Sequence, residues 1–302
     1  MTTASSRPAA VLSLGRIYCD MVFQGLDHMP QLGREIFAKD FALTPGGGAL
    51  ITAAHLAGLG RPAILLARYG TDALSTALYG QIESLGLDLN YLDRDASAGP
   101  QLTAVMVNDG DRAFVSRRAG HARPSTFEAA LANSGATHLH IAEYATLYEM
   151  SDAISLAKSH GLTVSLDPSW DNDLIGDPKF LQRTMGVDVF MPNLEEAYAL
   201  SGRAERFAAL QYLQQHFAIV ALKAGADGGL LAVGGDIISQ PSPKVTVIDT
   251  TGAGDAFNAG FLHAWLDGVA PADCLASAIA AGSRSVQAAG GTGSLDRATG
   301  SF

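Results

Sequence analysis

DTTGAGDAFNAGFL, residues 249–262, is preceded by the apolar, β-branched run Val245–Ile248. This order predicts a buried strand, then a glycine-rich turn, then the start of a helix. Gly252 and Gly254 have no side chains, so the N–H groups of the turn are accessible, and the first N–H groups of a helix have no partner within it. Because the helix dipole adds positive charge there, the turn is suited to bind a phosphate or another anion.

The residues after this turn predict a helix with one buried face. Phe257, Phe261 and Trp265 recur every four residues, which is the spacing of side chains on one side of a helix. Asp255 falls in the first turn of that helix. An acid at such a position often does no more than complement the helix dipole, but the adjacent glycines favour a role for Asp255 in an anion site.

Residues 249–262 resemble the C-terminal signature of the pfkB, or ribokinase-like, carbohydrate kinases. The resemblance implies that Asp255 is the catalytic base and that the amides of Gly252, Ala253 and Gly254 form an anion hole. It also implies a three-layer α/β/α ribokinase-like fold with a mostly parallel central sheet and a small β-sheet lid. Residues 1–302 are then expected to form a single kinase domain.

The composition limits the class of protein. Of the 302 residues, 48% are hydrophobic and 17% are charged, and 33 are glycines, which favours a compact α/β enzyme over a disordered chain. A formal net charge of -10 argues against a surface for nucleic acid or for an anionic membrane. Two cysteines provide no disulfide framework and no cysteine-rich zinc site. The first apolar run is too short to span a bilayer, so we expect a cytoplasmic protein.

Two segments predict strands that lie off the main sheet. Residues 17–45 contain two prolines and show no helical period, which indicates short strands and turns. Gln101–Asn108 and Arg112–Arg118 alternate apolar and polar residues on either side of a turn, which predicts a hairpin. We expect inserts at about 17–45 and 97–119 to form the lid. Of the neighbours Arg117 and Arg118, at most one can face an acidic acceptor, because adjacent strand residues point to opposite faces.

Further apolar segments predict the strands of the central sheet. They are Ala9–Leu14, Pro62–Gly70, His138–Tyr144, Thr163–Asp167, Val187–Met191 and Phe217–Leu222, with a hairpin over 229–239. Helices are expected over 71–86, with Thr71 as the N-cap, and over 151–161 and 271–289. His138 and His140 share one strand face, but no third ligand at suitable spacing accompanies them. Asp167 ends its strand at the edge where α/β sheets bind ligands, and either packing or ligand contact would explain it.

GGGALITAAHLAGLG, residues 46–60, again places glycines at a helix start. This pattern alone fits either close packing or close approach of a ligand to the backbone. It resembles the N-terminal glycine motif of the same family, which implies that Gly46, Gly47 and Gly48 contact the acceptor together with Asp20. Ile51 stands where most members carry an asparagine that hydrogen-bonds the acceptor. A β-branched apolar side chain cannot make that bond, so the identity of the acceptor and of the phosphorylated hydroxyl stays open.

The string PNLEEA begins another helix, with Asn193 and Glu196 three residues apart. A capping box explains this pair without any ligand. The family resemblance implies that the pair organises Mg²⁺ near the nucleotide, with Glu196 acting through water. Lys223, Gly225 and Gly228 lie in LKAGADGG, which is similar to the nucleotide-side loop of the family.

The resemblance extends to the end of the chain. It implies that the helix over 271–289 and Gly291 line the adenine pocket. Main-chain carbonyls near Asp249, Thr251 and Gly291 are then expected to hold a monovalent cation such as K⁺. Members of the family often dimerise through the lid, and a homodimer is possible for this chain on the same ground.

The sequence therefore predicts an ATP-dependent kinase that phosphorylates a hydroxyl of a sugar or sugar-like small molecule. It contains no P-loop motif and no completed G-x-G-x-x-G before a helix, which removes the P-loop and Rossmann classes. Two other hypotheses stay open. The chain is a nucleoside kinase if Ile51 faces a flatter, less polar acceptor, or a nucleotide- or sugar-binding regulator if the scaffold lacks turnover.

Overall fold

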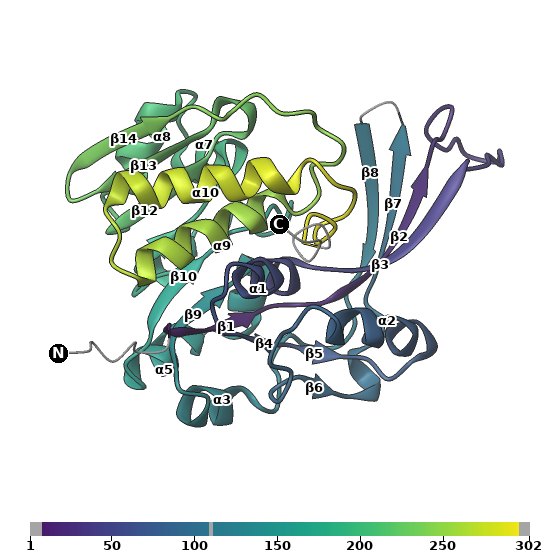
Figure 1. Cartoon of the computed structure of the whole chain (residues 1–302), viewed down its shortest axis with the longest axis horizontal. Coiled ribbons are helices and arrows are strands. Elements are labelled where there is room, and N and C mark those ends of the chain that lie inside the picture. The colour runs from purple at the N-terminus through teal and green to yellow at the C-terminus, as the bar shows by residue number, and fades with distance from the viewer. Residues whose placement is uncertain (1–7, 109–110, 296–302) are drawn as a thin grey trace, which may run out of the picture.

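The computed structural model describes residues 8–108 and 111–295, which form a body with a central sheet and a smaller sheet projecting from it (Figure 1). The strands of the central sheet lie in the order β14 (Asp236–Gln240), β13 (Gly229–Val233), β12 (Ile219–Lys223), β11 (Val189–Phe190), β10 (Thr163–Leu166), β9 (Ala136–Ile141), β1 (Ala10–Leu14) and β4 (Ala63–Leu66). Neighbours from β12 to β4 pair in parallel, whereas β13 and β14 pair antiparallel at one edge. The expected mostly parallel sheet is confirmed.

Helices cover both faces of this sheet, so the body has three layers. One face packs against α3 (Phe127–Asn133), α4 (Tyr144–Glu149), α5 (Ala153–Ser159), α6 (Phe180–Arg183), α7 (Leu194–Ser201) and α8 (Arg206–Leu213). The other packs against α1 (Gly48–Gly58), α9 (Ala253–Leu266) and α10 (Pro271–Ser285). Alternate residues of one strand serve the two cores, since Leu12 and Leu14 face the first and Val11 faces the second. Burial on both faces explains why these strands read as continuous apolar runs.

Smaller elements complete the body. α2 (Ala73–Glu83) packs with α1 around Leu50, Leu65 and Ile82. β5 (Arg68–Tyr69) and β6 (Asp93–Arg94) form a short parallel pair, and η1 (Ala96–Ala98) and η2 (Gly225–Asp227) are single 3₁₀ turns. The helix expected from Thr71 begins two residues later, because the Asp72 side chain caps it by accepting from the N–H groups of Leu74 and Ser75.

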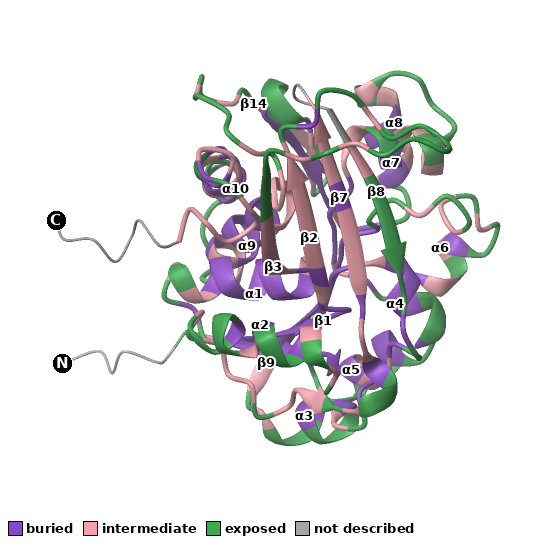
Figure 2. Ribbon diagram, turned by 90° about the vertical axis from the view of Figure 1, so that its right-hand side faces the viewer, coloured by how far each residue is buried: buried purple, intermediate pink, exposed green. Residues whose placement is uncertain are grey.

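The smaller sheet, which we call the lid, contains β3 (Asp40–Gly46), β2 (Tyr18–Gln24), β7 (Leu102–Asn108) and β8 (Asp111–Arg117) in that order. β2 and β7 pair in parallel, and the other neighbours pair antiparallel. The predicted hairpin is β7–β8, although its turn at 109–110 lies outside the described residues. In Figure 2 the lid strands are mostly half-buried or exposed, in contrast to α1 and α9, which are mostly buried.

A buried arginine anchors the root of the lid to the body. Arg16 follows β1, is 3% exposed and donates hydrogen bonds to the Gln101 side chain at 3.1 Å and to the carbonyls of Ala119 and Gly120, each at 3.0 Å. It also forms an ion pair of 2.7 Å with Glu149 of α4. Because Gln101 precedes β7 and Ala119 follows β8, this single side chain ties together the segments that connect the two sheets.

The strand predicted over Val245–Ile248 is wrong. Residues 241–250 form an extended loop between β14 and α9, in which Val247 is 57% exposed and Ile248 is 58% exposed. β14 already forms the edge of the central sheet, so this segment crosses toward α9 without pairing as a strand. The Ile248 N–H instead donates to the carbonyl of Val286, which follows α10. Its apolar side chains line a pocket and not the core.

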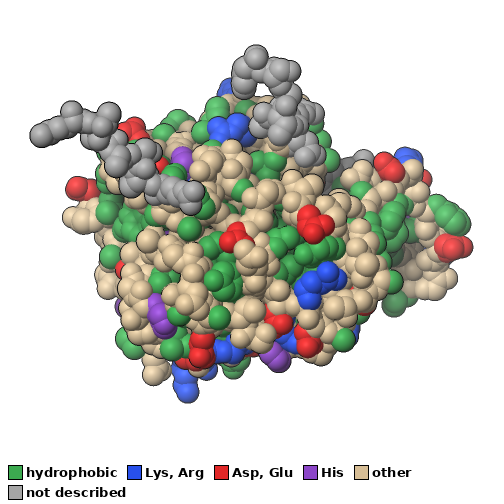
Figure 3. All heavy atoms as spheres, turned by 60° about the horizontal axis from the view of Figure 1, so that its bottom comes forward, with side chains coloured by type: hydrophobic (Ala, Val, Ile, Leu, Met, Phe, Trp, Pro, Cys, Tyr) green, Lys and Arg blue, Asp and Glu red, His purple; other side chains and the backbone are tan. Residues whose placement is uncertain are grey.

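Two other predicted strands are shorter than expected. The segment over 62–70 is divided into β4 and β5, and the segment over 138–144 ends at Ile141, because α4 begins at Tyr144. The face of the molecule seen in Figure 3 carries Lys, Arg, Asp and Glu side chains scattered among uncharged ones. Among the helices that the structure describes, none is long and apolar enough to cross a membrane.

Candidate active site

The predicted anion turn lies at the N-terminus of α9. Gly252 is the N-cap residue with φ of 73°, a left-handed conformation that glycine adopts without strain. A Cβ atom added to Gly252 would lie 2.7 Å from Cα of Gly291 and 3.0 Å from Cγ2 of Ile51. The position therefore requires glycine both for its backbone angle and for the close approach of two other segments.

Asp255 lies in the first turn of α9 and against the N-terminus of α1. A Cβ atom added to Gly48 would lie 2.9 Å from Oδ1 of Asp255, so only glycine leaves room for this carboxylate. Burial raises the pKa of Asp255 to about 7, the negative charges of Asp167 and Glu196 act in the same direction, and Lys223 opposes them. The group therefore titrates near neutral pH, which suits a general base.

A buried ion pair lies beneath the anion turn. Nζ of Lys223, at the end of β12, is 2.5 Å from Oδ2 of Asp167, which follows β10. The same carboxylate oxygen accepts a hydrogen bond of 2.6 Å from Nδ2 of Asn258, on α9. A Cβ atom added to Gly254 would lie 3.6 Å from Nζ of Lys223, so the ammonium group sits beside the turn. The pKa of Lys223 is raised because the carboxylates of Asp167, Glu196 and Asp255 outweigh the cost of its burial.

Asn193 and Glu196 form the predicted capping box at the start of α7. The Glu196 N–H donates to Oδ1 of Asn193 at 2.9 Å, and the Asn193 N–H donates to Oε2 of Glu196 at 2.8 Å. Burial, and then the charge of Asp167, raises the pKa of Glu196 to about 7. An isolated parallel bridge joins Asn193 to Lys223, which brings the box beside the ion pair. Across the described residues, no group of three His, Cys, Asp or Glu side chains could hold a metal ion by itself.

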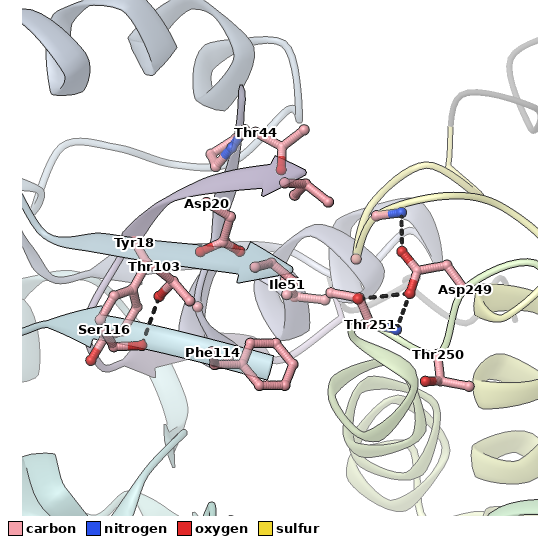
Figure 4. Close-up of a pocket in the computed structure, with 18 of the residues that line it drawn as sticks. Tyr18, Asp20, Thr44, Ile51, Thr103, Phe114, Ser116, Asp249, Thr250 and Thr251 are labelled. Carbon is pink, nitrogen blue, oxygen red and sulfur yellow. Dashed lines mark hydrogen bonds between the residues drawn. The ribbon is translucent and has the colours of Figure 1, made fainter. Parts of the chain in front are cut away.

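A pocket of about 1090 Å³ lies between the lid and the body (Figure 4). It runs from the inner face of the lid, past Gly46, Gly47 and Gly48, to Gly290 and Gly291. Asp20, on β2, faces this pocket, and burial raises the pKa of its carboxyl to about 6. A Cβ atom added to Gly46 would lie 1.9 Å from Oδ2 of Asp20. Gly47 has φ of 103°, and a Cβ atom there would lie 2.3 Å from the carbonyl oxygen of Arg16.

Ile51 lines the middle of the pocket, on α1. It is 4% exposed, and a Cβ atom added to Gly291 would lie 2.5 Å from its Cδ1. The side chain therefore fills the space between α1 and the loop after α10. Ile51, which stands where the family resemblance leads one to expect an asparagine, therefore gives the pocket an apolar wall.

The loop at Asp249 is held by its own carboxylate. Oδ1 accepts from the N–H and the hydroxyl of Thr251 at 2.8 and 2.7 Å, and Oδ2 accepts from the N–H of Gly290 at 2.9 Å. The carbonyl of Gly291 lies 2.9 Å from Nε2 of His55. These contacts tie the segment before α9 to the segment after α10.

The other predicted nucleotide-side residues lie in the turn after β12. Gly225 has φ of 57° and Gly228 has φ of 92°, and a Cβ atom on Gly228 would lie 2.0 Å from the carbonyl oxygen of Gln240. The two glycines start and follow η2, at the end of the strand that carries Lys223. Because β11 and β12 are neighbours, this turn and the capping box lie at the same end of the sheet, and the approach of Gly254 to Lys223 places the anion turn beside them.

Sequence reasoning missed several residues of the site. Asp167 was left between packing and ligand contact, and the structure places it in the buried ion pair. Asn258 was overlooked, although its position three residues after Asp255 on one helix was a usable signal. Arg118 and Glu143 line the pocket, whereas Arg117 bonds the carbonyl of Pro100. His138 and His140 are buried, and their rings bond Thr163 and Ser165 within the body.

Comparisons with known proteins show the family of the chain. The family model described as pfkB family carbohydrate kinase matches residues 11–298. The chain is 29% identical over 270 residues to the ATP-dependent ribose-1-phosphate kinase of Halopiger xanaduensis, a match that covers 85% of this chain and 84% of that protein. It is 28% identical over 239 residues to a fructokinase of Klebsiella pneumoniae, with 72% and 76% covered.

Solved structures show the same fold. Ribokinase of Arabidopsis thaliana, complexed with ribose and ATP, superposes with a TM-score of 0.78 at 23% identity, covering 98% of this chain and 100% of that one. The nucleoside kinase of Methanocaldococcus jannaschii gives a TM-score of 0.80 at 20% identity, with 97% and 98% covered. The predicted ribokinase-like fold is confirmed.

Proposed function

The chain belongs to the pfkB family of carbohydrate kinases, phosphotransferases with an alcohol group as acceptor, and from that premise we propose that it transfers the γ-phosphoryl group of ATP to a hydroxyl of a sugar or sugar-like small molecule. One observation carries the proposal. Asp255 is a partly buried carboxylate with a pKa of about 7, and it lies between the anion turn of α9 and Gly48, which lines the pocket.

In this proposal Asp255 orients the acceptor hydroxyl and accepts its proton. The acceptor oxygen forms a bond to the γ-phosphorus of ATP, the bond from that phosphorus to the β,γ-bridging oxygen breaks, and ADP leaves with its electron pair. The amides of Gly252, Ala253 and Gly254 stabilise the negative charge on the transferring group. Since phosphoryl transfer depends mainly on positioning and electrostatics, the position of this carboxylate matters more than its raised basicity.

The remaining predicted residues take supporting roles in the proposal. Asp20 and Gly46, Gly47 and Gly48 hold the acceptor, with Ile51 as an apolar wall. Lys223, Gly225, Gly228 and Gly291 lie on the nucleotide side, together with Asn193.

Mg²⁺, when bound with ATP, would neutralise phosphate charge, and Glu196 would hold it through water. The raised pKa of Glu196, beside a second carboxylate, fits a site that gains from added positive charge. A K⁺ site from carbonyls near Asp249, Thr251 and Gly291 is also part of the proposal, although the Gly291 carbonyl already has His55 as a neighbour.

We extend the proposal to the organisation of the chain. Residues 1–302 act as one kinase domain, with lid inserts at about 17–45 and 97–119. A homodimer through the lid would cover apolar side chains that are exposed on it, such as Phe41 at 52% and Val115 at 64%. A cytoplasmic location is the setting in which such a kinase meets ATP.

The acceptor is the open part of the proposal. The names of the two relatives include a phosphorylated sugar and an uncharged one, ribose 1-phosphate and fructose. A nucleoside acceptor is the second candidate, because Ile51 and the half-exposed Phe114 give the pocket apolar walls that suit a base. A binding regulator without turnover would not need Asp255 at its present position.

Asp255→Asn tests the proposal. We expect kcat to fall by about 10²- to 10⁴-fold, since the general base is lost, while ATP binding changes little. Phosphorylated product is measured with a panel of sugars and nucleosides, and ATP affinity by calorimetry. Asp273→Asn is the matched control, because Asp273 is also a first-turn acid, on α10, and lies outside the site. Near-normal turnover in Asp255→Asn would contradict the assignment, and tight sugar binding by the unmodified protein without any turnover would favour the regulator.

A further inference from the structure

The end of the pocket beside the lid, where we propose that the acceptor binds, is rich in carboxylates. Four of them line it, namely Asp20, Glu143, Asp171 and Asp173. Arg118 is the one Lys, Arg or His side chain among the described residues that line this pocket. An anionic acceptor placed here would therefore meet more negative than positive charge, and like charges brought together in a partly buried site oppose binding.

Arg118 is already engaged by groups of the protein. One of its terminal nitrogens lies 2.7 Å from Oδ2 of Asp171, and the phenol of Tyr18 lies close enough for each group to shift the pKa of the other. The carboxylate of Glu143 lies close enough to affect both Arg118 and Tyr18 electrostatically. Asp171 is the more enclosed partner, with a side chain 12% exposed against 43% for Arg118. The cation thus joins the end of the lid to the loop after β10 and is not held ready for a ligand phosphate.

Among the described residues, the inner face of the lid offers no other Lys, Arg or His side chain to an anion. Pairing across its strands aligns a polar row, Thr44, Asp20, Thr103 and Ser116. The next row outward is apolar and consists of Ala42, Val22, Val105 and Phe114. Side chains of both rows line the pocket. Hydroxyl groups of an acceptor can hydrogen-bond the side chains of the polar row. The part of the acceptor that extends to the next row contacts apolar side chains.

From these observations we propose that the acceptor is uncharged, and that Asp171 enforces this specificity by occupying Arg118. Phosphorylated and carboxylated sugars are excluded as acceptors, whereas free sugars, polyols and nucleosides are admitted. This inference rests on the proposed kinase function and narrows its substrate class. It assigns to the loop after β10 a role in substrate choice that is separate from the chemistry at Asp255.

The first experiment compares matched acceptors that differ only by a phosphate. Each uncharged acceptor is paired with two phosphate esters, so that the reacting hydroxyl is free in at least one of them. The esters are ribose 1-phosphate and ribose 5-phosphate, fructose 1-phosphate and fructose 6-phosphate, and the 3′- and 5′-monophosphates of adenosine, each assayed for kcat/KM with ATP and for affinity by calorimetry. We expect the uncharged member of the best pair to be favoured by about 100-fold or more. An anionic acceptor that matches or exceeds its uncharged partner would overturn the proposal. Absence of turnover with every acceptor would contradict the kinase function instead. The affinities of the same pairs would then decide whether the pocket prefers uncharged ligands to anionic ones.

The second experiment frees Arg118. Asp171→Asn keeps an oxygen at the position that accepts the Asp173 N–H at 3.0 Å, so the loop is expected to keep its conformation, but it removes the charge that pairs with Arg118. We expect kcat/KM for the phosphorylated member of a pair to rise by about tenfold relative to the uncharged member. Asp173→Asn is the control, since it removes an equal charge from the same loop and leaves the pair intact. An equal gain in both variants, or none in Asp171→Asn with native thermal stability, would refute the role of Asp171.

Discussion

The ion pair under the anion turn and the ion pair at the lid use the same chemistry in different surroundings. Lys223 and Asp167 are 11% and 7% exposed, and Asn258 bonds the same carboxylate. Arg118 and Asp171 are 43% and 12% exposed and bridge two parts of the fold. Burial makes the first pair part of the folded core, where a missing partner leaves an uncompensated charge. Exposure makes the second pair contribute little to folding, so changes there can alter which ligand binds without unfolding the protein.

The largest expected effect is on the buried pair. Lys223→Met should lower the free energy of unfolding by about 3 to 5 kcal/mol, because Asp167 is left buried without its cation. Urea denaturation at pH 7, without ligands, measures this change. Lys158→Met is the matched control, since Lys158 and Asp188 form a pair whose side chains are 34% and 32% exposed. If the free energy of unfolding falls equally in both variants, the contrast between the buried pair and the exposed pair does not hold.

A smaller effect, of opposite sign, is expected at Asp255. Its pKa of about 7 in the folded protein lies above its ordinary value of 3.8, so the folded state binds the proton more tightly than the unfolded chain. The protein therefore loses stability at this position as pH rises from about 4 to about 7, and the full penalty applies above pH 7. Asp255→Asn should be more stable than the unmodified protein at pH 8 by on the order of 2 kcal/mol, with the difference shrinking toward pH 5. Thermal unfolding across this range measures it, and a difference that does not vary with pH would contradict the assigned pKa.

The smallest effect on stability is expected at the lid. Arg118→Met should change the free energy of unfolding by less than about 1 kcal/mol, because the arginine is 43% exposed and solvent screens its charge from its partner. The same urea titration used for Lys223→Met provides the measurement. If the free energy of unfolding falls by about 3 kcal/mol or more, the pair of Arg118 and Asp171 is needed for folding. The contrast between the two ion pairs would then be wrong.

The sequence was informative wherever function depends on neighbours along the chain. Gly252 to Asp255 lie within one turn, and Asn193 and Glu196 of the capping box are three positions apart, so local patterns predict both. The parallel sheet was also predictable, since its strands are short apolar runs separated by helical segments.

Contacts between distant residues were not predictable in the same way. Lys223 and Asp167 are 56 residues apart, and Asn258 and Asp167 are 91 apart, so no local pattern records that they meet. The run Val245–Ile248 was mistaken for a buried strand because its side chains are apolar and β-branched. Residues of this run line a pocket instead. A pocket wall and a core strand both use apolar side chains, so the sequence pattern does not distinguish them.

Helix α1 touches both halves of the site. Its first residue, Gly48, lies against Asp255 and the acceptor pocket, Ile51 fills the space beside Gly291, and His55 bonds the Gly291 carbonyl. Because this helix of eleven residues is packed on most sides, we expect it to move as a rigid unit, without bending between these points. A ligand that shifts one end of α1 thereby shifts the loop at Gly291, and reciprocity requires a ligand at that loop to influence the first ligand equally. Ligands bound at these two places are therefore expected to change each other's affinity by the same factor.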